Sequence, residues 1–170
     1  IQKLKGHAGS IINLQFSPDG KYIATGSMDN SAIIFELSSG KTIGKFKDHT
    51  DWVNWVQFSP DGKRLVTASN DNSSKVYDIA SGKMLFSLYG TPKEYGVKIA
   101  KYTADGRYLV IASSNIASMY DANNGRLIRS FEGQTVKAGS LEFNREGLQF
   151  ATSCWDNTAK IYDLKRGNLI

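Results

Sequence analysis

Two short signatures each return four times along the chain at nearly constant spacing. The first is an aromatic residue followed three and four positions later by an acidic residue and glycine, and its copies begin 41 to 44 residues apart. Its copies are Phe16–Gly20, Phe58–Gly62, Tyr102–Gly106 and Phe143–Gly147. A second signature follows each copy in the same order, around Phe35, Tyr77, Tyr120 and Tyr162. A period of this length indicates four stacked structural modules without linkers.

Each module has the pattern of four short strands joined by tight turns. In the first module, apolar and polar residues alternate over stretches of strand length, namely 12–16, 22–25, 33–37 and 43–46. The residues between these stretches are rich in Gly, Asp, Asn and Ser, which favour turns. A four-stranded sheet with two apolar faces is not stable alone, but radial stacking covers both faces. The sequence therefore predicts an all-β propeller of four-stranded antiparallel blades.

The composition is that of a globular chain with a core. Hydrophobic residues make up 41% of the chain and charged residues 22%. The longest aliphatic run, Leu109–Ala112, is much shorter than the roughly 20 residues needed to cross a bilayer, and the first residues do not resemble a signal peptide. The single cysteine, Cys154, excludes an internal disulfide. We therefore expect a cytoplasmic protein with no membrane association.

The residues of the modules resemble the WD-repeat (Trp-Asp repeat) family. Blades of this family carry Gly-His before the first strand, Ser-x-Asp between the second and third strands, and Trp-Asp at the end of the third strand. The first module matches with Gly6-His7, Ser27, Asp29 and Phe35-Glu36, and the second with Asp48-His49, Ser69, Asp71 and Tyr77-Asp78. Phe or Tyr replaces Trp throughout. The resemblance covers essentially the whole chain and implies four propeller blades.

In this family, the His, Ser or Thr, Asp and Trp side chains form a hydrogen-bonded tetrad. A carboxylate can accept hydrogen bonds from an imidazole and from turn amides, and a hydroxyl can bond the ring. The tetrad positions implied here are His7, Ser27, Asp29, His49, Ser69, Asp71, Tyr77, Asp156 and Tyr162. The third module has no His before its first strand, and Cys154 replaces Ser in the fourth. We therefore expect the third blade to be the weakest.

The resemblance implies one propeller or half-propeller over residues 1–170. The blade modules are expected at 8–47, 50–89, 94–132 and 135–170, and residues 1–7 are expected to complete the fourth strand of a terminal blade. Rings of this family usually contain about seven blades. Three arrangements therefore stay open: part of a larger propeller, a homodimer in which residues 1–6 of each chain complete the partner's last blade to give an eight-bladed ring, and a closed four-bladed monomer.

The sequence offers no arrangement that is typical of catalysis or metal binding. A nucleophilic triad needs a base near Ser or Cys, and a zinc site needs three or four ligands. His7 and His49 are the only histidines, and both belong to the repeat pattern, as does Cys154. The Asp residues also recur at turns, where bonds to the local backbone explain them. We expect a protein that is not an enzyme and has no cofactor and no metal.

The resemblance places a recognition surface on the top face, formed by the connections between blades and by the turns between second and third strands. Family ligands often contact side chains near the start of each first strand and next to the turn Asp. The corresponding positions are Ser10, Ile12, Met28, Trp52, Asn54, Asn70, Lys98, Lys137 and Trp155. Aromatic residues such as Trp52 and Trp155 often anchor interfaces. The expected function is a scaffold that binds a protein or peptide on this face.

The net charge of +5 raises the alternative of an acidic partner. Nine basic residues follow or flank the turns of the opposite, bottom face: Lys21, Lys41, Lys63, Arg64, Lys83, Arg107, Arg126, Lys165 and Arg166. We interpret these basic residues as parts of solvated hairpins with acidic neighbours, and not as a surface that binds nucleic acid or anionic lipid. A further alternative is a half-propeller, natural or engineered, whose activity is self-assembly.

Overall fold

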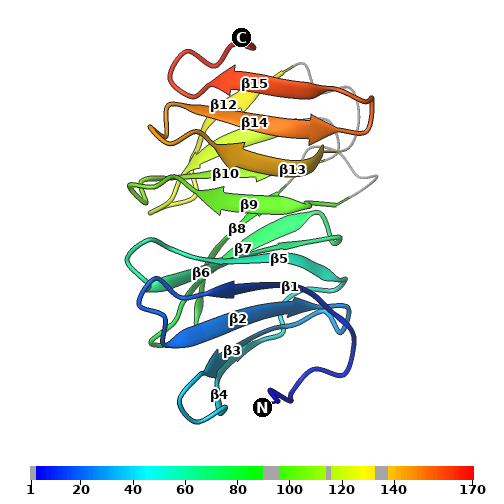
Figure 1. Cartoon of the computed structure of the whole chain (residues 1–170), viewed down its shortest axis with the longest axis vertical. Coiled ribbons are helices and arrows are strands. Elements are labelled where there is room, and N and C mark those ends of the chain that lie inside the picture. Colours follow the sequence, from blue (N-terminus) through cyan, green and yellow to red (C-terminus); the bar gives the residue numbers. More distant parts are fainter. Residues whose placement is uncertain (1–2, 90–95, 114–115, 133–137) are drawn as a thin grey trace.

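The computed structural model describes residues 3–89, 96–113, 116–132 and 138–170, and this part of the chain forms strands and turns without a helix (Figure 1). The first sheet contains β1 (Ile11–Phe16), β2 (Tyr22–Ser27), β3 (Ala32–Glu36) and β4 (Thr42–Phe46). The second contains β5 (Val53–Phe58), β6 (Arg64–Ser69), β7 (Ser73–Asp78) and β8 (Met84–Tyr89). The third contains β9 (Ile99–Tyr102), β10 (Tyr108–Ala112), β11 (Ala117–Asp121) and β12 (Leu127–Phe131). The fourth contains β13 (Ala138–Phe143), β14 (Gln149–Cys154) and β15 (Ala159–Asp163).

Each sheet is an antiparallel meander in which neighbouring strands follow one another in the sequence. The first three sheets have four strands in the orders β1-β2-β3-β4, β5-β6-β7-β8 and β9-β10-β11-β12. The fourth sheet has three strands, and Leu169 adds an isolated antiparallel bridge to Tyr162. The prediction of an all-β chain with four antiparallel sheets is therefore confirmed.

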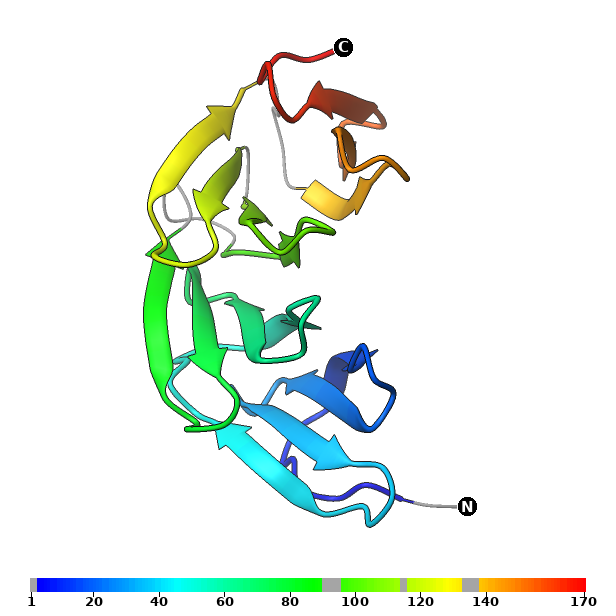
Figure 2. The ribbon, with the colours of Figure 1, turned by 90° about the vertical axis from the view of Figure 1, so that its left-hand side faces the viewer.

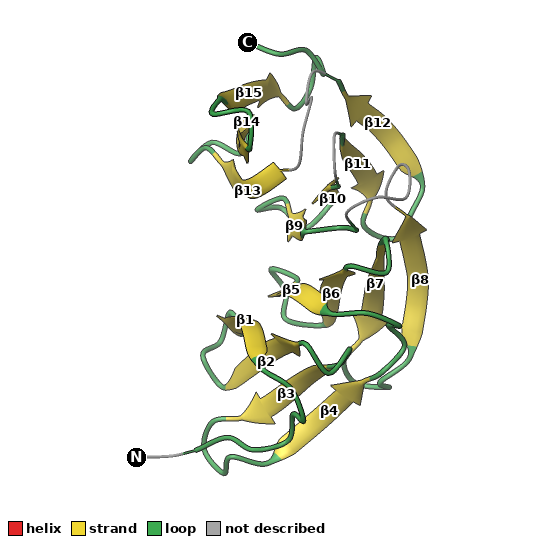
Figure 3. Ribbon diagram, turned by 90° about the vertical axis from the view of Figure 1, so that its right-hand side faces the viewer, coloured by secondary structure: helices red, strands yellow, loops and turns green. Residues whose placement is uncertain are grey.

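The four sheets stack into an open arc (Figures 2 and 3). The first strands β1, β5, β9 and β13 line the inner side of the arc and contact one another in this order, and β4, β8 and β12 lie on the outer side. The two ends of the chain lie at opposite ends of the arc. The sheets do not close, so the four-bladed closed monomer, which the sequence left open, is not the arrangement of this structure.

The core consists of three layers between neighbouring sheets and a smaller cluster on the first sheet, in which Leu4 packs against Ile23, Ile33 and Phe35. Between the first two sheets, Ile34 and Phe46 of the first sheet pack against Val56, Leu65 and Tyr77 of the second. Equivalent side chains fill the two following layers, and the aromatic residues of the second repeat signature are central to them. Phe46 lies 4.5 Å from Tyr77 between ring centroids, and the rings of Phe150 and Tyr162 are stacked at 5.0 Å. An aromatic residue at this position therefore serves the core where the family pattern has Trp.

The turns that follow the first strands repeat one local geometry. At Gly20 the backbone has φ +68°, in the left-handed region that favours glycine. The Asp19 carboxylate accepts hydrogen bonds from Ser17 Oγ at 2.6 Å and from the Lys21 amide at 3.1 Å. The same arrangement occurs at Asp61 and Asp105. These carboxylates are thus occupied by local turn contacts.

Substitution in a layer between sheets should lower the free energy of unfolding. Leu65 is fully buried between the first and second sheets, so Leu65→Ala should cost about 3 kcal/mol through lost contacts and a residual cavity. Leu127→Ala, at a position that is 52% exposed on β12, should change it by less than about 0.5 kcal/mol. Urea denaturation followed by circular dichroism measures both. Equal effects of the two variants would contradict the assignment of the core.

Candidate functional site

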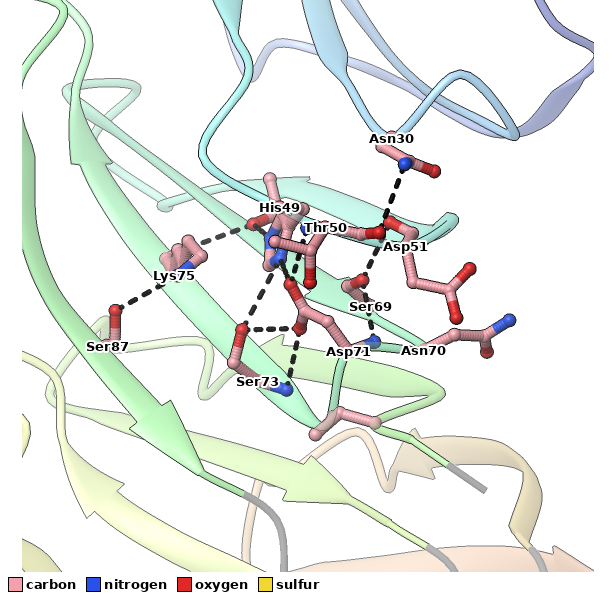
Figure 4. A network of polar contacts seen from close by, with 12 residues as sticks. Asn30, His49, Thr50, Asp51, Ser69, Asn70, Asp71, Ser73, Lys75 and Ser87 are labelled. Carbon is pink, nitrogen blue, oxygen red and sulfur yellow. Dashed lines mark hydrogen bonds and ion pairs between the residues drawn. The ribbon is translucent and has the colours of Figure 1, made fainter. Parts of the chain in front are cut away.

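Two histidines tie the segments before β1 and β5 to the sheets that follow. His7 Nδ1 donates to the Asp29 carboxylate at 3.0 Å, and His7 Nε2 lies 2.8 Å from Thr25 Oγ1. At the second sheet His49 Nδ1 is 2.7 Å from Asp71 Oδ2 (Figure 4). His49 Nε2 is 2.6 Å from Thr67 Oγ1. Both imidazole side chains are almost completely buried. Each network therefore fixes a connection between blades against a turn of the top face.

Backbone amides and hydroxyl groups also donate hydrogen bonds to the carboxylates of Asp29 and Asp71. Asp71 accepts from the Thr50 amide at 3.1 Å, the Ser73 amide at 3.0 Å and Ser73 Oγ at 2.6 Å. Burial alone would raise the pKa of Asp71, but the hydrogen bonds from His49, Ser73 and Thr50 outweigh it and hold the pKa well below its usual range. The pKa of Asp29 is lowered in the same way by its own donors.

The hydroxyl partners of the imidazoles differ from the expectation. The sequence pattern assigned Ser27 and Ser69 to this role, whereas Thr25 and Thr67 contact the rings. Ser27 Oγ instead accepts from the Asp29 amide at 3.1 Å, and Ser69 Oγ donates to the Asp51 carbonyl at 2.9 Å. Residues two apart in a strand share one face. The signal that could have revealed the Thr residues is therefore their repetition, two positions before each Ser.

The third sheet has a different side chain at the position of these threonines, whereas the fourth sheet keeps Thr152 and Asp156 at the corresponding positions and has Cys154 in place of Ser. Ile111 stands where the first two sheets have Thr, and it is buried. In the fourth sheet Asp156 forms an ion pair with Lys160 at 2.8 Å, and Cys154 Sγ lies 3.8 Å from Thr152 Oγ1. The segments before β9 and β13 fall largely outside the described residues. The weakness expected of the third blade stays a prediction.

The tyrosines assigned to the tetrad are buried among core side chains. Tyr77 packs on Phe46, and burial together with the nearby Asp48 carboxylate raises the pKa of Tyr77 far above its usual value. Tyr162 packs against Phe131 and Phe150. Both rings therefore belong to the layers between sheets.

The top face has a depression of about 380 Å³ at the inner side of the arc. Its lining comes from all four sheets and consists of Ile12, Asn13, Asn54, Trp55, Lys98, Ile99, Gly139 and Trp155. Four of the residues expected on the top face meet here: Ile12, Asn54, Lys98 and Trp155. Trp155 is 69% exposed. The exposed indole of Trp155 thus forms one wall of the depression, and the ammonium group of Lys98 lies on another.

A small polar cluster supports the cationic wall. Asn54 Nδ2 donates to Asn70 Oδ1 at 2.8 Å and to the Val97 carbonyl at 3.1 Å, and Lys98 Nζ donates to the same Asn70 oxygen. The third sheet can approach this turn because of Gly96, whose φ is +69°, and any Cβ there would collide with the Asn70 backbone. Asn70 is therefore part of the same site, although it does not line the depression.

The remaining expected positions lie apart from the depression. Met28 and Trp52 are 41% and 44% exposed, and the Met28 amide donates to the Ser10 carbonyl at 2.9 Å. Lys137 lies outside the described residues. Sequence reasoning had assigned Trp55 to packing, and Trp55 does pack against two core clusters, with Lys101 Nζ 5.1 Å from its ring centroid. It also lines the depression, as do Asn13 and Ile99, which sequence reasoning missed.

On the bottom face, two of the nine basic side chains have partners within the chain. Arg107 Nε forms a 2.6 Å ion pair with Asp105, and Arg64 donates to the Ala122 carbonyl at 2.6 Å. Within the described residues, no group of three or more His, Cys, Asp or Glu side chains is placed to hold a metal ion. The same residues contain no helix long and apolar enough to span a membrane.

Comparison with known proteins agrees with the sheet pattern. The profile of the family described as "WD domain, G-beta repeat" matches residues 1–36, 40–78 and 125–163, which is more than half of the chain. Strands β9, β10 and β11 of the third sheet fall in the unmatched segment, although the strand order of this sheet is the same as in the first two.

Three curated proteins illustrate the similarity. The chain is 27% identical over 171 residues to an uncharacterized WD repeat-containing protein of Synechocystis, a match that covers all of this chain and 36% of that protein. It is 32% identical over 71 residues to Eukaryotic translation initiation factor 3 subunit I of Vanderwaltozyma polyspora, covering 41% of the chain and 20% of the relative. It is 48% identical over 42 residues to Protein HIR1 of Kluyveromyces lactis, covering 25% of the chain and 5% of that relative. The chain therefore spans about a third or less of these relatives' lengths.

The His-Asp networks should make stability depend on pH. Because the folded-state pKa of Asp71 is below the unfolded value of about 3.9, its stabilising contribution is complete above about pH 5 and is lost as the pH falls. We expect Asp71→Asn to lower the free energy of unfolding by about 2 kcal/mol at pH 7 and to reduce its fall between pH 5 and pH 3. Urea midpoints at several pH values measure this.

Glu146→Gln is a matched control for the loss of an acidic side chain, because Glu146 is exposed at a turn of the fourth sheet. It should leave the pH profile nearly unchanged. Parallel profiles for Asp71→Asn and the unsubstituted chain would contradict the proposed origin of the acid sensitivity.

Proposed function

Because the chain belongs to the WD-repeat family, we propose that it is a non-enzymatic scaffold that binds a protein or peptide on its top face. WD-repeat proteins generally act as interaction scaffolds, and fold alone does not name a partner. The observation that carries the proposal is the top-face depression, which joins an exposed Trp155 to Lys98. The blades of this scaffold correspond to modules 8–47, 50–89, 94–132 and 135–170, and a cytoplasmic location fits the free, buried Cys154.

The walls of the depression indicate the chemistry of the partner. Trp155 and Ile12 offer apolar surface, and an exposed indole is a common anchor of interfaces. Lys98 Nζ offers a charge-assisted hydrogen bond to a carboxylate. The Asn70 oxygen already receives bonds from Asn54 and Lys98, which holds both side chains in place. A segment with an acidic residue beside an aromatic or aliphatic residue matches these groups.

The relatives are compatible with a role in a larger assembly. One of them is named as a subunit of a translation initiation factor. We extend only the general role of an interaction module to the present chain. A basic bottom face that binds nucleic acid is less well supported, because Arg107 and Arg64 already bond acceptors within the chain.

Self-assembly is a second candidate function. It is favoured by one observation, the exposed apolar faces of the first and fourth sheets. Leu14 and Phe16 on β1 are 54% and 58% exposed, and Ile161 on β15 is 46% exposed. Monomeric proteins rarely leave contiguous apolar patches uncovered.

Peptide binding tests the top-face proposal. The probe is an array of peptides that place one Asp or Glu beside one aromatic or aliphatic residue, with Asn or Gln variants as matched partners. Trp155→Ala and Lys98→Glu should each weaken binding by about 10-fold or more. If the peptide binds in the depression, the double variant Trp52→Ala, Trp155→Ala should have the same dissociation constant as Trp155→Ala alone. Fluorescence anisotropy of selected peptides measures the dissociation constants.

Two controls separate the top face from general surface effects. Leu148→Ala changes a side chain that is 63% exposed in the same sheet but at a bottom-face turn, and Lys63→Glu makes the same charge change as Lys98→Glu. Neither should alter binding. The proposal fails if no peptide of this class binds, or if Trp155→Ala and Lys98→Glu bind as tightly as the controls.

A further inference from the structure

A cavity of about 560 Å³ lies between the third and fourth sheets on the bottom face, opposite to the top-face depression. The turns that follow β9, β13 and β15 border it. Its walls include Tyr108, Met119, Ile128, Arg129, Leu164 and Lys165. Pockets that bind small molecules usually have volumes of about 300–1,000 Å³. The cavity belongs to a junction between two sheets of this chain, and not to the exposed outer face of the first or the fourth sheet.

The side chain of Arg129 explains why this junction is not closed by apolar packing. Arg129 on β12 pairs with Met119 on β11. The corresponding pair in the second sheet is Phe86 on β8 with Val76 on β7. Phe86 packs against the core cluster between the second and third sheets. A layer that ends in a phenyl ring at one junction therefore ends in a guanidinium group at the next.

A glycine in the following sheet receives each of these two side chains. A Cβ at residue 125 would lie only 2.7 Å from the ring of Phe86, and a Cβ at residue 167 would collide with the guanidinium group of Arg129. Both glycines have positive φ, at +71° and +82°. Arg129 therefore lies against the backbone of the turn that follows β15, and this contact fixes its position at the cavity.

A second difference leaves the cavity without a polar bridge between the sheets. Arg64, the first residue of β6, donates to the Ala122 carbonyl at 2.6 Å and so joins the second and third sheets. Its counterpart is Tyr108, the first residue of β10. Tyr108 and Leu164 both pack against the core cluster between the third and fourth sheets. Apolar groups therefore line this junction where a guanidinium group spans the preceding one.

The charged side chains at the cavity leave one guanidinium group without a counter-ion. Arg107 forms a 2.6 Å ion pair with Asp105. Lys165 and Glu146 also line the cavity, and these two exposed side chains have opposite charges. Arg129 is half-buried, and within the residues that the structure describes it has no hydrogen-bond or ion-pair partner. A guanidinium group in this setting favours a carboxylate, which can accept two parallel hydrogen bonds from it.

We propose that this cavity binds a small organic carboxylate with an apolar body. The carboxylate accepts hydrogen bonds from the Arg129 guanidinium group, and the aliphatic or aromatic body of the ligand lies against Tyr108, Met119 and Ile128. The lining has one positive charge in excess, which matches a monocarboxylate better than a doubly charged phosphate. The inference goes beyond the proposed function and does not depend on the top-face depression.

Titration with octanoate, decanoate and phenylpropanoate tests the proposal, and the primary amide of each acid is its uncharged partner. Carbon-13 labelling of the methionine methyl groups gives three signals. Met119 lines the cavity, whereas Met28 and Met84 do not and serve as internal references. The carboxylates should shift the Met119 signal to saturation. The amides should bind about 10-fold more weakly, because they lack the charge-assisted hydrogen bonds.

Variants of Arg129 separate the effect of charge from that of shape. Arg129→Met should weaken carboxylate binding by about 10-fold and leave amide binding unchanged. Arg129→Phe introduces the residue of the second sheet and should abolish the binding of both, because the ring fills the cavity. The matched control is Arg126→Met, since Arg126 is exposed in the turn before β12 and does not line the cavity. Calorimetry measures the dissociation constants, and circular dichroism shows whether each variant is folded.

Three results would overturn the proposal. The first is a Met119 signal that none of the carboxylates shifts. The second is equal affinity for an acid and its amide, which would exclude the charged contact. The third is an equal loss of binding in folded Arg129→Met and Arg126→Met, which would place the anion elsewhere. Trp155→Ala should leave the Met119 shift unchanged, so this proposal and the top-face proposal can fail independently.

Discussion

The structure depends on apolar packing between the faces of neighbouring sheets. Every internal sheet has one face that covers the sheet before it and another that is covered by the sheet after it, and the most buried side chains lie in these layers. No single four-stranded sheet could bury both of its faces, so no module is stable alone. The aromatic residue near the end of each third strand, such as Tyr77 or Tyr162, lies in the middle of this packing. The size of the ring matters more at this position than the presence of the Trp of the family pattern.

The buried His-Asp networks act on a different part of the molecule. They do not join the faces of the sheets but hold the connections between blades against the turns of the top face. Asn30 extends this restraint between sheets, because its Nδ2 donates to the Thr50 carbonyl at 3.2 Å. The packed layers therefore set the curvature of the arc, and the polar networks fix the loops that present side chains for binding. The third and fourth sheets use other contacts, such as the Asp156–Lys160 pair.

Much of the fold follows from the sequence because it depends on repetition. The spacing of the aromatic-acidic-Gly signature and the alternation within modules predict sheets, strand order and turn carboxylates. Details that depend on the exact direction of a side chain do not follow, as shown by Thr25 and Thr67, which contact the histidines in place of Ser27 and Ser69. The complete lining of the depression could not be predicted from the sequence either. Its expected members were identified by position, but Asn13 and Ile99 join them only because four inner strands converge.

The top-face depression and the arc are physically linked. Ile12, Asn54, Lys98 and Trp155 come from the first, second, third and fourth sheets respectively, so a change in the angle between any two sheets would separate the indole from the ammonium group. Packing in the three layers between the sheets therefore also holds together the groups that line the depression.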